Sequence, residues 1–67
     1  MRYVIVAMTD EGTLQYFAGD GFKPSLLQAA RFRTEKDAAR RVRASVYCRR
    51  MLESGARIEF RRVASPA

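Results

Sequence analysis

The sequence predicts a two-layer α+β fold with the chain order ββαβ, in which one long helix packs on one face of a three-stranded antiparallel sheet. Three segments rich in β-branched and aromatic residues predict the strands, namely Arg2–Met8, Thr13–Ala18 and Arg57–Val63. One stretch with helical periodicity and capping residues at both ends predicts the helix over Glu35–Glu53. The 67 residues are expected to form a single domain, with residues 64–67 as a frayed tail.

The first strand is apolar on both of its faces. Alternate residues of Arg2–Met8 point to opposite sides of a sheet, and both sets are hydrophobic: Tyr3, Ile5 and Ala7 on one side, Val4, Val6 and Met8 on the other. A strand with two apolar faces is typical of the middle of a sheet. We therefore expect the strand order 2-1-3.

Turn residues divide the rest of the first half of the chain. Gly12 closes a short connection that makes the first two strands a hairpin. Gly19–Gly21 ends the second strand, and Pro24 hinders its continuation because it lacks a backbone donor. Ser25–Gln28 has a capping-box pattern that predicts a single helical turn, and an extended Ala29–Phe32 then leads to the main helix.

The long helix has a start signal and a stop signal. Thr34 is a good N-cap with acidic residues in the turn that follows, and Gly55 is a good C-terminal stop. A helix over Glu35–Glu53 would be about 28 Å long. Its predicted sheet-facing stripe consists of Ala38, Ala39, Val42, Ser45, Val46 and Leu52. Cys48, on its flank, is expected to be a small buried side chain.

One face of the predicted sheet has no helix to cover it. The third strand directs Ile58 and Phe60 toward the helix and its charged residues away from it. On the uncovered face, apolar side chains from the first two strands would form an association surface. Two alternatives follow from this pattern: a homodimer through the open sheet face, or coverage of that face by the segment Pro24–Phe32.

Composition excludes several classes of function. The chain has no histidine and a single cysteine, which excludes Ser–His and Cys–His nucleophile pairs and leaves no plausible structural zinc site. Its seven carboxylates are scattered over turns, caps and exposed positions. The longest apolar run, Tyr3–Met8, is too short to span a bilayer. We therefore expect no catalysis, no metal, no cofactor, no membrane association, and a cytoplasmic location.

A basic ridge is the feature of the helix that points most clearly to a function. The 13 lysines and arginines against seven acidic residues give a net charge of +6. Five helix residues spaced by 4, 3, 4 and 3 positions share one exposed side: Lys36, Arg40, Arg43, Tyr47 and Arg50. Such a ridge attracts an acidic protein surface or the phosphates of a nucleic acid. The alternative is a solvated helix face without a partner.

Part of the chain resembles a family of small proteins encoded by phages. The pattern consists of the aromatic strand Gln15–Phe17, the pair Gly21-Phe22, and the helix entry Ala29–Ala38, which contains Phe32 and Thr34 at matching positions. Similar patterns occur in phage accessory proteins, and some anti-CRISPR proteins have the same size and layout. The resemblance carries no catalytic residues.

If the resemblance holds, it implies a non-catalytic binding protein of phage or mobile-element origin that acts in a bacterial host. Such a protein would inhibit a defence system by occluding a nuclease or a surveillance complex. Its partner would be a protein or ribonucleoprotein with an acidic surface. The residues alone also support a small basic nucleic-acid-binding module that contacts phosphates through its arginine-rich helix.

Overall fold

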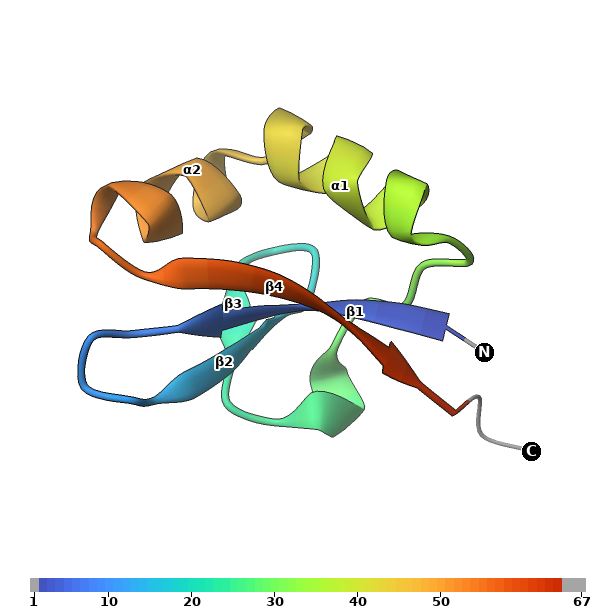
Figure 1. Ribbon diagram of the computed structural model, residues 1–67, viewed down its shortest axis with the longest axis horizontal. Coiled ribbons are helices and arrows are strands. Elements are labelled where there is room, and N and C mark those ends of the chain that lie inside the picture. The colour runs from blue at the N-terminus through green and yellow to red at the C-terminus, as the bar shows by residue number, and fades with distance from the viewer. Residues whose placement is uncertain (1, 65–67) are drawn as a thin grey trace.

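The computed structural model describes residues 2–64, which form a layer of helices on one face of a curved sheet (Figure 1). In chain order the elements are β1 (Arg2–Met8), β2 (Leu14–Phe17), β3 (Phe22–Lys23), the 3-10 helix η1 (Leu26–Gln28), α1 (Glu35–Ala44), α2 (Val46–Glu53) and β4 (Arg57–Val63). The predicted α+β class is confirmed. Two details are corrected, because the sheet has four strands rather than three and the long helix is divided in two.

β1 occupies the interior of the antiparallel sheet, whose strand order is β3-β2-β1-β4. It pairs with β2 through residues 6–8 and with β4 along all seven of its residues. Its middle residues, 4–7, are at most 1% exposed, so both faces of the strand are covered. The central position and the order predicted for the three longer strands are therefore confirmed.

The fourth strand, β3, was not predicted. Its two residues, Phe22 and Lys23, pair with Phe17 and Tyr16 of β2. The rings of Phe17 and Phe22 meet edge to face, with centroids 5.6 Å apart. Pro24 lacks a backbone N–H only at its own position. The strand can therefore form over the two residues before it and ends before Pro24.

The predicted single helix is interrupted at Ser45. The backbone of this residue is extended, with φ −95° and ψ 127°, and its Oγ accepts a hydrogen bond from the backbone N–H of Cys48 at 3.4 Å. Serine competes for backbone donors and is favoured at helix N-termini, so α2 begins here as a new helix inclined to α1 (Figure 1). As a result, Val46 and Leu52 do not face the sheet as predicted, and each is 48% exposed.

We expect Ser45→Ala to lower the free energy of unfolding by about 1 kcal/mol, because α2 would lose its N-cap. Urea denaturation followed by circular dichroism measures this change. The control is Ser54→Ala at the exposed C-terminal end of α2, which is expected to cost less than about 0.5 kcal/mol. A Ser45→Ala protein more stable than the unchanged chain would show that the interruption depends on something other than the cap.

The main core lies between the helices and the sheet. Ile5 and Phe17 from the sheet meet Ala38 of α1 and Cys48 of α2, and all four are buried. Partly buried side chains surround them: Phe22, Ala30, Phe32, Val42, Ile58 and Phe60. The inward direction predicted for Ile58 and Phe60 is confirmed, as is the burial of Cys48. The small side chains of Ala38 and Cys48 allow the helices to approach the sheet closely.

The other face of the sheet is covered by the segment Pro24–Phe32. Within it, η1 lies on the side of the sheet opposite α1 and α2, and Ala29 packs against Val4 and Val6 (Figure 1). Val4 and Val6 are 0% and 1% exposed, so the apolar centre of the predicted homodimer face is already buried within one chain. Coverage by this segment is thus the alternative observed. Of the predicted frayed tail, only the exposed Ala64 falls within the described residues.

Candidate functional site

A groove rich in arginine runs between the segment that enters α1 and one side of that helix. Its volume is about 510 Å³. We call it the basic groove, and it is lined by Arg31, Phe32, Arg33, Asp37, Arg40, Arg41 and Ala44. With four guanidinium groups and one carboxylate, the lining carries a net charge of +3.

The first wall of the groove is fixed to the sheet by Phe32. Its backbone N–H donates to the carbonyl of Tyr3 and its carbonyl accepts from the N–H of Tyr3, both at 2.8 Å. The Phe32 side chain packs against the main core. Because side chains alternate along an extended segment, Arg31 and Arg33 both project away from that core. The docking of one aromatic residue therefore positions two arginines.

The second wall is one side of α1. Arg40 and Arg41 each lie three or four residues from both Asp37 and Ala44, the spacings that align side chains along a helix. Thr34 fixes the start of the helix, since its Oγ1 accepts a hydrogen bond from the backbone N–H of Asp37 at 3.0 Å. Ala44, with its small side chain, lies at the C-terminal end of this wall.

The guanidinium groups of the basic groove are available for a ligand. Within residues 2–64, no ion pair or side-chain hydrogen bond of the structure involves Arg31, Arg33, Arg40 or Arg41. Each guanidinium presents five N–H donors in a planar fork that matches the oxygens of a phosphate or a carboxylate. Four such groups in one groove favour an extended anion over a single small one.

The five residues of the predicted ridge are divided between two helices, with three of them on α1 and two on α2. Arg40 lines the basic groove, whereas Lys36 and Arg43 are exposed on α1 and line neither groove. Tyr47 and Arg50 lie beyond the interruption at Ser45, on α2. A continuous ridge required the single long helix that was predicted, and the interruption at Ser45 divides that helix in two.

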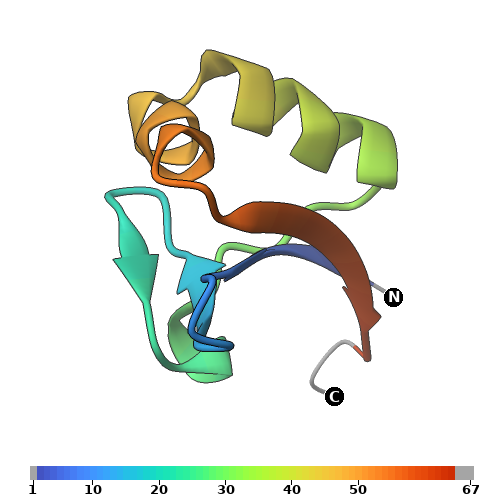
Figure 2. The ribbon, with the colours of Figure 1, turned by 60° about the vertical axis from the view of Figure 1, so that its left-hand side comes forward.

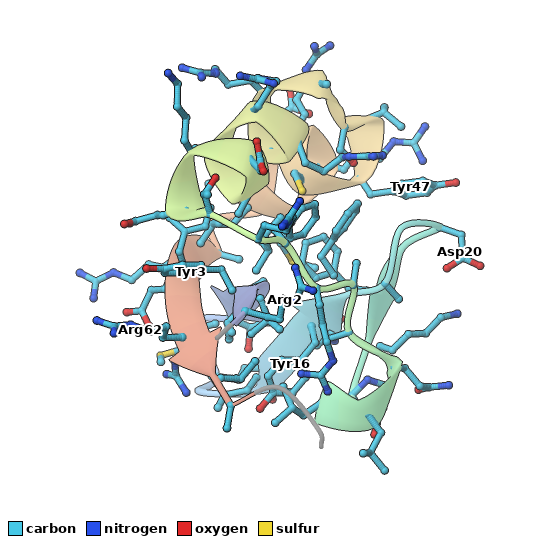
Figure 3. All side chains as sticks on the ribbon, turned by 90° about the vertical axis from the view of Figure 1, so that its right-hand side faces the viewer. Arg2, Tyr3, Tyr16, Asp20, Tyr47 and Arg62 are labelled. Atoms are coloured by element: carbon cyan, nitrogen blue, oxygen red, sulfur yellow. The ribbon has the colours of Figure 1, made fainter. Side chains whose placement is uncertain are left out.

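Tyr47 and Arg50 line a second, smaller groove between α2 and the β2–β3 hairpin. Its volume is about 330 Å³, and its other walls are Gln15, Phe22, Met51 and Ser54. Tyr47 is 41% exposed and lies on the same side of the molecule as Asp20, with Tyr3 and Arg62 on the opposite side (Figure 3). This groove has one cationic side chain against four in the basic groove, so it is the weaker anion site.

Three groove residues, Arg31, Arg33 and Arg41, were not among the predicted site residues. The alternation Arg31-Phe32-Arg33 ahead of a helix start was the available signal. It becomes informative only when Phe32 is known to dock on β1, because that contact holds the segment with both arginines beside α1. Arg41 belonged neither to the predicted ridge nor to the predicted sheet-facing stripe, and it is exposed.

Cys48 is buried in the main core beneath α2. Burial raises the pKa of its thiol above the ordinary value of 9.0, while a hydrogen bond with Ser45 and the positive charge of Arg41 act in the opposite direction. The thiol is therefore protonated and shielded at neutral pH, as befits a packing residue.

The Cys48 thiol makes stability depend on pH above neutrality. The pKa of the thiol is higher in the folded chain than in the unfolded chain. The protonated thiol therefore stabilises the fold fully at a pH below the unfolded-state pKa, and this stabilisation is lost as the pH rises from the unfolded-state pKa toward the folded-state pKa. We expect the free energy of unfolding, measured with urea, to fall as the pH rises through 9.0, the ordinary pKa of the thiol. Cys48→Ala should be less stable at neutral pH but show a smaller fall, and an equal fall in both proteins would contradict this assignment.

No family model, curated protein or solved structure matches the chain. Within residues 2–64 there is no group of three side chains able to hold a metal ion. No helix of the described residues has the length and apolar character that crossing a bilayer requires. Residues 2–64 form a small α+β fold in which four arginines line the basic groove.

Proposed function

We propose that this protein is a non-catalytic binding module whose basic groove holds the sugar–phosphate backbone of a nucleic acid. The observation that supports the proposal is that four arginines line one groove and that none of them forms an ion pair with a carboxylate in the described part of the chain. Arginine is the residue best suited to bidentate contact with phosphate.

The form of the groove favours a repeating anion. Its four arginines come from two separate walls, so together they offer more donors than one phosphate group can use. A nucleic-acid backbone presents phosphates in a row, and neutralising several of them releases condensed counterions. Contacts of this kind position the ligand without reading its bases, so we expect little sequence preference.

The interpretation drawn from the phage-like pattern stays a prediction. It assigns the chain to a phage or mobile element and makes it an inhibitor of a nuclease or surveillance complex in the bacterial cytoplasm. The guide RNA of such a complex would offer the basic groove the same phosphates as free nucleic acid does. The groove therefore suits either setting, and its affinity for phosphate is the property to measure first.

Salt dependence tests the proposal. We expect a fluorescently labelled oligonucleotide to bind, with log K falling linearly with log salt at a slope of about −3, since three or four phosphates would be neutralised. Fluorescence anisotropy with a single strand and with a duplex of the same sequence gives both slopes. Failure of both oligonucleotides to bind at about 20 mM salt, where phosphate contacts are strongest, would reject the proposal.

A further inference from the structure

β4 forms one margin of the sheet, with β3 at the opposite margin (Figure 2). All seven residues of β4 pair with β1 on its inner side, and no strand of the described residues lies on its outer side. A strand of this length at a sheet margin can serve as a template for another strand. Its side chains decide which strand it accepts.

The backbone of Phe60 faces outward from the sheet. Tyr3 uses both its N–H and its carbonyl to bond Phe32, on the side away from β4, so Tyr3 and Arg62 form a non-hydrogen-bonded pair. Pair types alternate along an antiparallel ladder, so Phe60, opposite Ile5, belongs to the same type as Arg62. The N–H and carbonyl of Phe60 therefore point toward solvent. Phe60 is also the midpoint of Arg57–Val63.

We propose that two copies of the chain pair antiparallel through β4, with Phe60 opposite Phe60 of the second copy. This register overlaps the full seven residues of both strands. It places Glu59 directly opposite Arg61 twice, once on each side of the two-fold axis. Opposite charges in direct cross-strand pairs are favourable, and like charges are unfavourable.

The neighbouring registers are disfavoured by the same two residues. If the register is centred on Glu59 instead of Phe60, Glu59 lies opposite Glu59 and Arg57 lies opposite Arg61. If it is centred on Arg61, Arg61 lies opposite Arg61. Within one chain, Glu59 and Arg61 already lie on the same face of β4, with Oε2 and Nη2 3.4 Å apart. Side by side in each copy, they give β4 a charge pattern that is self-complementary about Phe60, in the register that overlaps all seven residues of both strands.

The paired sheet would be continuous and eight-stranded. Because the two-fold axis stands perpendicular to the sheet, both helical layers, and hence both basic grooves, would lie on the same face. The pairing stands independently of the proposed function, since none of its residues lines the basic groove. One strand pair is a small interface, so we expect a weak dimer with a Kd between about 10 µM and 1 mM.

Charge reversal tests the register. We expect Glu59→Arg and Arg61→Glu each to weaken dimerisation by about tenfold or more in sedimentation equilibrium, because each replaces two attractive pairs by two repulsive ones. The double variant Glu59→Arg with Arg61→Glu should restore the dimer. Glu53→Arg, which makes the same charge change at the end of α2, is the control and should leave the Kd unchanged.

A monomeric unchanged protein at about 2 mM would overturn the proposal, since that concentration exceeds the expected Kd. So would a double variant no more dimeric than the two single variants. A second measurement avoids substitution altogether: exchange of the Phe60 backbone amide should slow as the protein concentration rises. A concentration-independent exchange rate at Phe60 would also overturn it.

Discussion

Reversing two charges in the basic groove, with Arg33→Glu and Arg41→Glu together, is expected to weaken binding to an oligonucleotide by about 100-fold at low salt. The two residues come from opposite walls of the groove, so the variant would place a repulsive carboxylate on each side of the backbone. The slope of log K against log salt should fall from about −3 to about −1, because fewer phosphates are neutralised. Fluorescence anisotropy across a salt series measures both quantities.

The matched control is Arg43→Glu together with Arg50→Glu. These residues belong to the ridge predicted from sequence but lie outside the basic groove, and both double variants carry a net charge of +2. If the groove holds the phosphates, the affinity of the control for the oligonucleotide should fall by less than about tenfold, because only its overall charge has changed. Equal losses in the two variants would show that net charge, and not the groove, governs binding. A larger loss in the control would favour the ridge.

Phe17→Ala is expected to leave the chain largely unfolded at 25 °C. Phe17 is 1% exposed at the centre of the main core, in edge-to-face contact with Phe22. Removing a buried phenyl ring costs about 3–5 kcal/mol, which approaches the whole stability of a domain this small. Loss of amide dispersion in the proton–nitrogen correlation spectrum would reveal the unfolded chain.

Leu27→Ala is the corresponding control for the core prediction. Leu27 is also apolar, but it is 88% exposed on η1, so its truncation should change the free energy of unfolding by less than about 0.5 kcal/mol. A folded Phe17→Ala protein with a loss under about 1 kcal/mol would contradict the placement of Phe17 at the centre of the core.

The elements that the sequence predicted correctly have strong local signals. β1 is apolar on both faces, Thr34 offers a cap beside acidic residues, and the cap of the 3-10 turn is Ser25, whose Oγ accepts from the N–H of Leu27 at 3.2 Å. At the other end of the helical layer, Gly55 adopts a φ of 95°, which other residues rarely adopt, and α2 ends before it. In each of these cases, a few neighbouring residues determine the conformation.

The details that were missed depend on contacts between distant residues. Ser45 fits a helix interior or an N-cap, and the choice is made by the packing of the residues around it, including Cys48 against the core. The strand β3 is too short for any periodicity and depends on the contact of Phe22 with Phe17. The basic groove depends on the docking of Phe32 against Tyr3, nearly thirty residues away in the chain.

The candidate site could therefore be predicted only in part. The concentration of arginine near the helix was visible, and Arg40 belongs to both the predicted ridge and the observed groove. Tyr47 and Arg50 were joined to the ridge by extrapolating one helical period through Ser45. Because an extended residue changes the direction of the helix that follows, the extrapolation failed at that point.

The central claim is that phosphates bind in the basic groove, and a nuclear magnetic resonance titration tests it most directly. Adding an unlabelled oligonucleotide to the isotopically labelled protein at low salt should shift the backbone amides of residues 31–33 and 37–44. The amides of β4 and of the β1–β2 turn should change little, and raising the salt should reverse the shifts. Shifts concentrated on β4 or on α2, or no shifts at low salt, would contradict the claim.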